Sequence, residues 1–302
     1  MSHDHTALEV TALDVTAVGV GLAVSSIGRP QLAELLQSAA SSTVPPVAVA
    51  IADQSQAGLR LPPQPTPFPV EVVGSGGGAS AGRNDAVRAL AGRAAVLAFP
   101  NDDSLLPPAT VAAVARCFAE RPDVVAVAGA LVEGGTARFE QPPQGSALDP
   151  VTIWRAIEPA MFVRTSAFEA VGGFRTDLGT GSPGPWQSGE GTDLLLRLMR
   201  AGGTVLSRPD IEMTGRGERR DLTPTALVAK HRGYARGTGF VYRAHPYSTY
   251  RRWRTVAGPW LRPTAHAPER VLSLRIAVAR SVGRVEGLLG RTLPGGGPTR
   301  WL

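Results

Sequence analysis

The chain has 302 residues, 43% hydrophobic and 19% charged, which excludes an intrinsically disordered protein and allows one large or two small domains. The net charge of +6 is uneven: residues 1–207 carry 13 Lys and Arg against 19 Asp and Glu, and residues 208–302 carry 18 against 6. A basic C-terminal part could face phosphates, anionic lipid, nucleic acid or the acidic first part of the chain itself.

Cysteine content and hydropathy bear on the location of the protein. Cys117 is the only cysteine, which excludes an internal disulfide framework and favours a reducing compartment. The N-terminus is polar, so we expect no secretory signal. The sequence has no uninterrupted run of about 18 apolar residues, so we expect no transmembrane helix. We therefore expect a cytoplasmic protein whose membrane contact, if there is one, is peripheral and at the inner face.

Strands and helices are predicted to alternate up to residue 132, after a loose leader over residues 1–14. Apolar runs predict buried strands over residues 16–25, 46–52, 70–73, 95–99 and 123–132. Helices are expected over 30–41, from about Arg83 to Gly92, and over 108–120. Such βαβ units predict an α/β protein with a doubly wound, mostly parallel sheet and helices on both faces.

The second half is predicted to be less regular up to residue 215 and basic after it. We expect a strand within 153–163, a helix over 165–171, a long loop over 172–191, a helix from Glu190 and a strand over 204–208. Residues 272–289 form a predicted amphipathic helix, followed by a Gly/Pro-rich tail over 294–302. The chain thus divides into an α/β domain, 1–215, and a basic, aromatic, largely helical C-terminal extension, 216–302.

An acidic turn follows the strand predicted over 95–99, namely Asn101, Asp102 and Asp103. The carboxyl ends of strands are where open α/β sheets bind ligands. Adjacent carboxylates repel each other, and Mg²⁺ is usually held by one or two carboxylates plus substrate phosphates. The alternative is a solvated turn that caps the next helix, and these residues alone favour neither.

Other polar residues are expected at the same edge: Ser25 and Ser26 with Arg29, then Asp53, and then Glu190 with Asp193. The Asp53 carboxylate could accept hydrogen bonds from a nucleobase or ribose, although a cap is the commoner role for such a residue. Arg83 and Asn84 open a predicted helix after a Gly-rich loop, where a phosphate could bind. That loop lacks the Gly-Lys-Ser/Thr sequence of a P-loop.

Six segments resemble, in order and spacing, the nucleotide-sugar-dependent glycosyltransferases of the GT-A fold, family 2 in the carbohydrate-enzyme classification. They are Ser25-Ser26-Ile27-Gly28-Arg29-Pro30, Asp53, Ala81-Gly82-Arg83-Asn84, Phe99-Pro100-Asn101-Asp102-Asp103, Gly172-Gly173-Phe174 and the stretch from Gly189 to Arg197. The resemblance implies a GT-A domain that transfers a sugar, with inversion, from a nucleotide-diphosphate sugar to an acceptor hydroxyl. It also implies a saccharide or lipid-linked acceptor in polysaccharide or glycolipid biosynthesis.

The resemblance also implies roles for individual residues. Asp103, with Asn101 in place of the family's first Asp of Asp-x-Asp, would hold Mg²⁺ or Mn²⁺. Gly191 stands where the family often has an Asp that acts as general base, so the base would be Glu190 or Asp193. Of these two, Glu190 is the choice, because it is nearer the loop. The donor would contact Ser26, Arg29, Asp53, Arg83, Asn84 and Asp102. Trp186 either stacks on a sugar or anchors its loop.

Two other functions fit parts of the sequence. Because Asn101 and Gly191 depart from the family pattern, the chain could be a GT-A-like protein that binds nucleotide without transferring sugar. Interleaved Arg and Tyr residues between Arg232 and Arg254 also allow a basic module for nucleic acid or a membrane surface. Of these two partners, an anionic membrane touched through residues 272–289 is compatible with the glycosyltransferase function.

Overall fold

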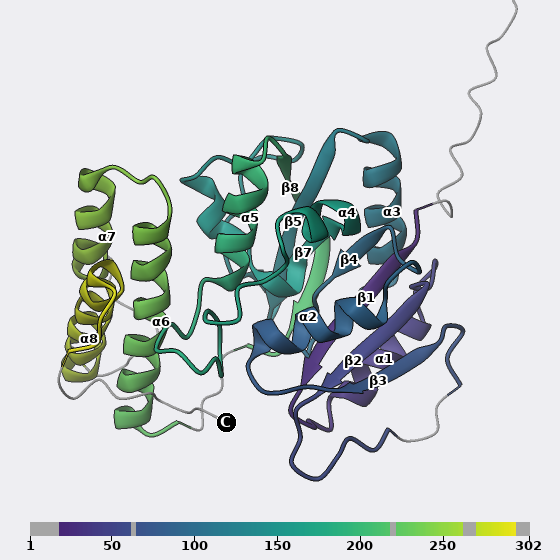
Figure 1. The fold of residues 1–302 in the computed structure, drawn as a ribbon, viewed down its shortest axis with the longest axis horizontal. Helices are drawn as coiled ribbons and strands as arrows, with labels where there is room; N and C mark the ends of the chain where they lie inside the picture. Colours follow the sequence, from purple (N-terminus) through teal and green to yellow (C-terminus); the bar gives the residue numbers. More distant parts are fainter. Residues whose placement is uncertain (1–17, 62–64, 218–221, 262–269, 294–302) are drawn as a thin grey trace, which may run out of the picture.

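The computed structural model describes residues 18–61, 65–217, 222–261 and 270–293. Within these residues, the strands of an eight-stranded sheet lie between Val20 and Gly215, and three long helices stand at one end of it (Figure 1). The predicted leader over 1–14 and the predicted tail over 294–302 lie outside the described residues.

The sheet is mixed but mostly parallel. Its strands are β1 (Val20–Ser26), β2 (Ala48–Asp53), β3 (Val70–Gly74), β4 (Val96–Ala98), β5 (Val124–Glu133), β6 (Thr136–Ala137), β7 (Met161–Arg164) and β8 (Thr204–Gly215). The order is β3-β2-β1-β4-β7-β5-β6, with β8 on β5. Strands β1 to β4 pair in parallel, as do β5 and β8, whereas β7 is antiparallel to both β4 and β5.

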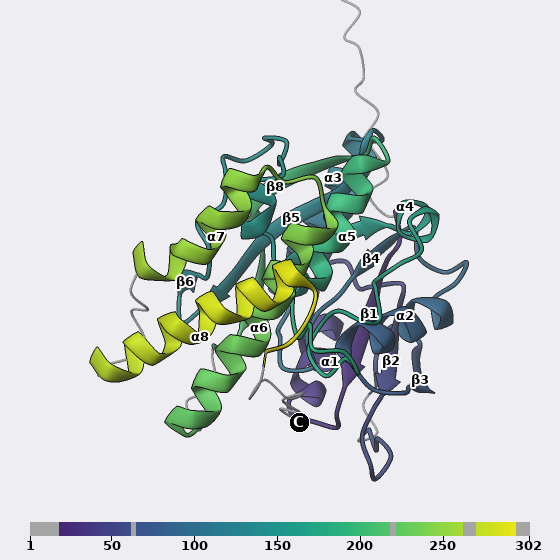
Figure 2. The same ribbon diagram turned by 60° about the vertical axis from the view of Figure 1, so that its left-hand side comes forward.

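Helices cover both faces of the sheet (Figure 2). Leu35 and Phe118 belong to the core on one face, and Leu90 and Leu195 to the core on the other. The predicted α/β class with a doubly wound, mostly parallel sheet is confirmed. The helices are α1 (Leu32–Ala40), α2 (Ala79–Ala89), α3 (Thr110–Glu120), α4 (Thr165–Ala170), α5 (Glu190–Arg200), α6 (Pro224–Ala244), α7 (Thr249–Leu261) and α8 (Arg270–Leu289), with short 3₁₀ turns η2 (Thr152–Arg155) and η3 (Glu158–Ala160).

The helix α2 begins at Ala79, so the start predicted near Arg83 is wrong. Ser and Gly have low helix propensity, and for this reason the sequence favoured a loop there. Tertiary packing overrides that preference, because a Cβ at Gly82 would lie 2.4 Å from the Ser25 side-chain oxygen. Only a glycine lets α2 approach the end of β1 this closely.

Strand β8 continues beyond Arg208, where the sequence predicted its end. Pro209 has no N–H to give to a neighbouring strand, which usually marks an edge or a bulge. The register with β5 shifts between Ala128 and Ala130, and pairing then resumes with Glu212. The proline therefore interrupts the strand without ending it.

The C-terminal helices pack on one another and against the α/β domain. Helix α6 packs along α8, where the fully buried Glu286 accepts hydrogen bonds from Arg232 and Arg236. The Trp154 ring stacks on Tyr242 with centroids 4.7 Å apart, which joins η2 to α6. In the part of the chain that the structure describes, no helix is both long and apolar enough to cross a bilayer.

Candidate active site

Strand direction brings distant polar residues to one edge of the sheet. The parallel strands β1, β2 and β4 all end there, with Ser26, Asp53 and the acidic turn. Because β7 runs antiparallel to β4, with Phe162 opposite Ala98, the residues before β7 also lie at this edge. The turn η3, which begins with Glu158, therefore joins the polar residues that follow the parallel strands.

Arg29 pairs with both carboxylates of the acidic turn. Its Nη1 lies 3.0 Å from Asp102 Oδ1 and 3.0 Å from Asp103 Oδ2. Asp102 is buried and also accepts a hydrogen bond from the Ser26 hydroxyl at 2.9 Å. Burial raises the pKa of Asp102, although Arg29 and Ser26 oppose the rise. The arginine thus offsets the repulsion expected between neighbouring carboxylates.

The fit of the turn to a divalent cation depends mainly on Asp103. Within the described ranges, no group of three or more His, Cys, Asp or Glu side chains could hold a metal ion. Arg29 contacts Asp103 through Oδ2, and this side chain remains 31% exposed; Asn101 Oδ1 lies 3.1 Å from Arg83 Nη2. Mg²⁺ bound together with substrate phosphates needs only one or two protein ligands. The two residues fit such an ion as a partial set of ligands.

Arg83 is a buried cation between the acidic turn and α5. Its Nη2 contacts Asn101, its Nη1 lies 3.4 Å from Glu190 Oε1, and its guanidinium lies 5.7 Å from the centre of the Phe174 ring. Its Nε is buried with no hydrogen-bond partner among the described residues. Arg83 therefore reaches the site from the second turn of α2 and not from a helix start.

Glu190 is a buried carboxyl group beside a second carboxylate. Its pKa is raised from 4.5 to about 7, first by burial and then by the negative charge of Glu158, with Arg83 opposing both. Glu158 Oε1 in turn accepts the Gly191 N–H at 2.9 Å. A carboxyl group that titrates near neutral pH can exchange a proton at working pH.

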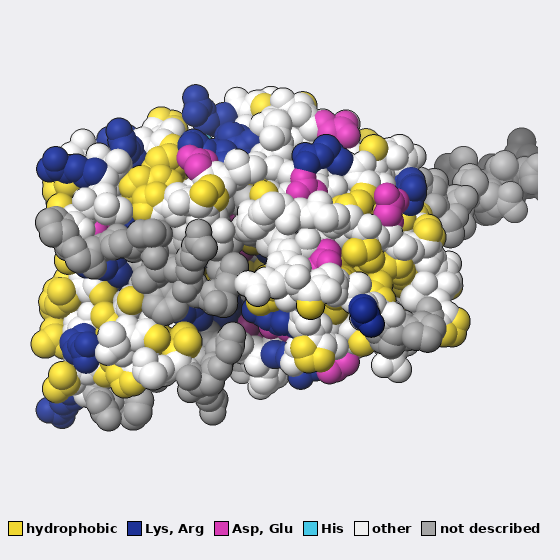
Figure 3. Space-filling view, turned by 60° about the horizontal axis from the view of Figure 1, so that its bottom comes forward, with side chains coloured by type: hydrophobic (Ala, Val, Ile, Leu, Met, Phe, Trp, Pro, Cys, Tyr) yellow, Lys and Arg dark blue, Asp and Glu magenta, His cyan; other side chains and the backbone are white. Residues whose placement is uncertain are grey.

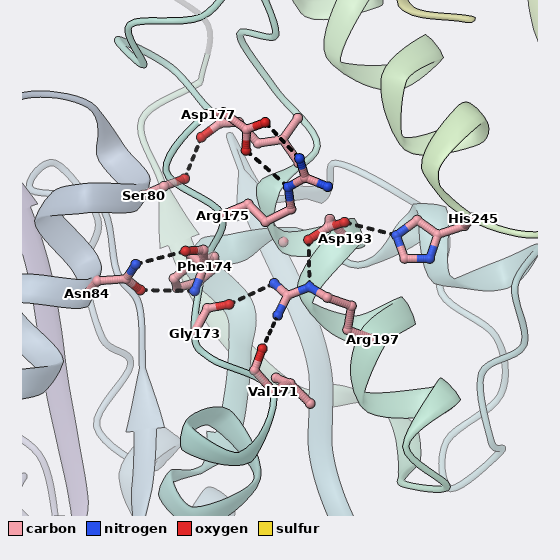
Figure 4. A network of polar contacts seen from close by, with 12 residues as sticks. Ser80, Asn84, Val171, Gly173, Phe174, Arg175, Asp177, Asp193, Arg197 and His245 are labelled. Carbon is pink, nitrogen blue, oxygen red and sulfur yellow. Dashed lines mark hydrogen bonds and ion pairs between the residues drawn. The ribbon is translucent and has the colours of Figure 1, made fainter. Parts of the chain in front are cut away.

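Asp193 is buried, and its carboxylate lies between His245 and Arg197 (Figure 4). Its Oδ1 lies 2.9 Å from His245 Nε2, and its Oδ2 accepts from Arg197 Nε at 2.8 Å. Burial raises the pKa of Asp193, but the contacts with His245 and Arg197 outweigh it and hold the pKa below the usual value. Arg197 also donates to the carbonyls of Val171 and Gly173. Asp193 thus joins α5, the end of α6 and the Gly-Gly-Phe turn.

Asn84 clamps the same turn. Its amide donates to the Phe174 carbonyl at 2.8 Å and accepts the Phe174 N–H at 2.9 Å (Figure 4). Gly172 and Gly173 have φ of 77° and 70°, a conformation that favours glycine. In this structure Asn84 is therefore engaged in holding the loop and not directed at a phosphate.

Trp186 lies in the long loop that precedes α5 and is 8% exposed. Its ring stacks on Phe240 of α6, with centroids 5.0 Å apart. Of the two roles that the sequence left open, this packing corresponds to the anchor of the loop, because the ring stacks on Phe240 and little of the residue is exposed.

A cavity of about 610 Å³ opens between the loops that follow β1 and β2. Its lining includes Gly28, Arg29 and Leu59. The Asp53 carboxylate accepts the N–H groups of Ser55 and Leu59, which lower its pKa although burial opposes them. Asp53 thus shapes the second loop as a cap, and the cavity lies beside the Arg29 end of the acidic turn.

No family model and no curated protein matches the sequence, but solved structures match the fold. TarS 1–349 of S. aureus, a GT-A-like glycosyltransferase, superposes with a TM-score of 0.53 in its complex with UDP-GlcNAc. The sequence identity is 12% over 91% of this chain and 93% of that chain. This chain has the GT-A fold. A mannosyltransferase of Pyrobaculum calidifontis with GDP-Man and Mn²⁺ matches at a TM-score of 0.52 and 16% identity, over 94% of this chain and 79% of its own.

Two residues near the candidate site were not predicted. Glu158 precedes its strand, so the rule that ligands gather after parallel strands gives no reason to select it. His245 is one of three histidines in the basic extension, about 50 residues away from Asp193, its partner. A pairing of that kind has no local sequence signal, and only the packing of α6 against α5 creates it.

Proposed function

We propose that this protein is a glycosyltransferase that moves a sugar from a nucleotide-diphosphate sugar to an acceptor hydroxyl. The observation that carries the proposal is the grouping of two arginines and a carboxyl group of raised pKa at one sheet edge, beside a cavity of about 610 Å³. Cations suit the diphosphate, and the carboxylate suits the acceptor proton. The neighbours crystallised with UDP-GlcNAc and GDP-Man support a donor of this class.

In this proposal the nucleoside enters the cavity between the loops after β1 and β2. Asp53 shapes the second of these loops, and Ser26 and Asp102 hold Arg29 at the rim. Arg29 and Arg83 then face the diphosphate, with the unpaired Arg83 Nε as a further donor. Charge-assisted hydrogen bonds of this kind are the strongest that a protein offers to phosphate.

A divalent metal, Mg²⁺ or Mn²⁺, would be held by Asp103 with Asn101 and the donor phosphates. Such an ion supplies positive charge against the charge that develops on the departing diphosphate. The Mn²⁺ in the GDP-Man complex of the mannosyltransferase supports this assignment.

Transfer requires that the acceptor hydroxyl lose its proton as its oxygen attacks the anomeric carbon. Direct attack on the face opposite the diphosphate would invert that carbon. Of the two carboxylates on α5, Glu190 is our choice of base, because its pKa of about 7 suits proton exchange near neutral pH. Asp193 is held by Arg197 and His245, which favours a positioning role.

Binding and turnover test the proposal separately. Nucleoside diphosphates should stabilise the full chain in the presence of Mn²⁺, by about 2.7 kcal/mol at a concentration of 100 times Kd. A panel of UDP-, GDP- and dTDP-sugars should then show donor turnover that Glu190→Gln removes. If no nucleotide raises the melting temperature, the donor-binding function is wrong.

A binding protein without transfer is the second candidate. Arg29 already occupies both carboxylates of the acidic turn, and position 191 has no side chain. Nucleotide binding without turnover of any donor would favour this candidate over the glycosyltransferase.

The C-terminal helices carry an exposed apolar and basic surface, which we propose contacts an anionic membrane. Figure 3 shows Lys and Arg side chains among hydrophobic ones at the end of the molecule formed by these helices. Both helices repeat exposed apolar residues at helical spacing, the pattern of interfacial helices. The residues are Tyr250, Trp253 and Trp260 on α7 and Val271, Leu274 and Val278 on α8, with exposed Arg254, Arg270 and Arg275.

Such a surface fits an acceptor that is linked to lipid. In a flotation assay, the full chain should rise with vesicles that contain anionic phosphatidylglycerol. It should stay at the bottom of the gradient when the vesicles contain only neutral phosphatidylcholine. The double variant Trp253→Ser, Leu274→Ser should abolish flotation. The control variant Val151→Ser should not, because Val151 is also exposed (43%) but lies outside the C-terminal helices. Equal binding of the double variant would show that these helices are not the contact.

A further inference from the structure

The carboxylate of Glu158 occupies the space of a missing side chain. Gly191 has no Cβ, and a Cβ built on its backbone would lie 2.5 Å from Glu158 Oε1 and 2.7 Å from Glu158 Cγ. Real Cβ atoms do not approach other atoms so closely. A side chain at 191 and the carboxylate of Glu158 are therefore alternative occupants of one position at the start of α5.

Glu158 is held in this position as an anion would be. Its Oε1 accepts the N–H of Gly191, one of the first residues of α5. The first N–H groups of a helix have no partner within the helix and carry partial positive charge, so a carboxylate is stabilised there. The residue comes from η3, which the antiparallel β7 brings to the same edge as the acidic turn.

Glu158 and Glu190 differ in what they can reach. Glu190 is 7% exposed and contacts Arg83, whereas Glu158 is only half-buried. Of the two, Glu158 is thus the carboxylate that an acceptor arriving from solvent can meet. Their charges interact, since Glu158 contributes to the raised pKa of Glu190.

We propose that Glu158 is a catalytic residue, which forms the general base together with Glu190 and is the member that the acceptor hydroxyl meets first. This inference rests on the proposed function. In the step, the acceptor oxygen bonds to the anomeric carbon, and the bond from that carbon to the diphosphate oxygen breaks. Its electron pair leaves on the diphosphate, while the hydroxyl proton passes to a carboxylate oxygen of the Glu158–Glu190 pair.

The isosteric variant Glu158→Gln keeps an acceptor for the Gly191 N–H and removes only the charge. Release of nucleoside diphosphate is followed with UDP-, GDP- and dTDP-sugars and Mn²⁺, with water or glycerol as the acceptor. We expect kcat to fall about 100-fold, with unchanged affinity for nucleoside diphosphate. The acidic limb of the remaining activity should move to lower pH, because the repulsion on Glu190 is lost. Glu169→Gln, at an exposed position on α4, is the matched control.

A swap of positions tests the shared space. Glu158→Ala should lose activity as Glu158→Gln does, and adding Gly191→Asp to it should recover about tenfold or more, because a carboxylate returns to the vacated place. Gly191→Asp alone should give no gain over the wild type, since Glu158 already fills that space. Thermal unfolding of each variant separates a loss of folding from a loss of chemistry.

The outcomes distinguish this inference from the proposed function. Full kcat and an unshifted pH profile in Glu158→Gln would overturn the base role of Glu158 while leaving the glycosyltransferase intact. A folded double variant as inactive as Glu158→Ala would overturn the shared position. A wild-type chain that binds no nucleoside diphosphate, or binds it but turns over no donor, would refute the proposed glycosyltransferase itself, and the base role with it.

Discussion

The ionisation of Glu190 should weaken the folded protein, and Glu190→Gln tests this by equilibrium unfolding. In the folded state the pKa of Glu190 is about 7, against an ordinary value of 4.5. A group whose pKa rises on folding stabilises the folded state when protonated, and this advantage is lost as pH rises through the folded pKa. The gap between the two values corresponds to about 3 kcal/mol.

The expected result is a difference that depends on pH. The unfolding free energy of the Gln variant minus that of the wild type should increase by about 3 kcal/mol as the pH is raised from about 4.5 to about 8.5. Titrations of other groups largely cancel when the variant is compared with the wild type. A constant cost of losing the contact with Arg83 shifts the stability difference equally at every pH and so does not affect how it changes with pH. Urea unfolding at both pH values, with Glu169→Gln as control, measures it.

A pH-independent difference would refute the reasoning, because it would mean that Glu190 titrates as an ordinary exposed carboxylate. If the variant both gains unfolding free energy and loses donor turnover, the buried Glu190 carboxylate lowers the stability of the protein but is needed for its activity.

Three further changes test the surrounding structure. Asp103→Ala should weaken binding of nucleoside diphosphate about tenfold, or about 1.4 kcal/mol, in Mn²⁺ but not in EDTA; calorimetry measures both, and equal loss in both would remove Asp103 from the metal. Asp193→Asn should lower stability by about 2–3 kcal/mol through the loss of charged hydrogen bonds while leaving the acidic limb of the pH–rate profile in place; a shifted limb would make Asp193 the base. Glu286→Ala leaves Arg236 buried without its carboxylate and should cost about 3–5 kcal/mol in urea unfolding, whereas a cost below about 1 kcal/mol would place the pair in solvent.

The sequence by itself determined the elements of the first half and their order. Apolar runs separated by turn residues predict β1, β2 and β4 within a few residues, because buried strands must exclude charge along their whole length. The acidic turn and Glu190 were selected for a similar local reason, as polar residues directly after a strand or at a helix start. Such features are written in neighbouring residues and need no knowledge of the fold.

Tertiary structure decided which of these residues face one another. Arg83 reaches the site only because Gly82 lets α2 pack against the end of β1, where helix propensity opposed a helix. The sequence offered Asp193 as the second candidate for the base, and only the fold brings His245, from the end of α6, onto its carboxylate. Contacts between distant segments have no local sequence signal, so propensity and spacing cannot predict them.

The carboxylate of Glu158 shows the same limit most clearly. The sequence revealed that Gly191 lacks a side chain where a carboxylate was expected, but not what fills the gap. Only the antiparallel direction of β7 carries Glu158 to that edge, within 2.9 Å of the Gly191 nitrogen. Strand direction depends on which neighbours a strand pairs with, and this is a property of the whole sheet.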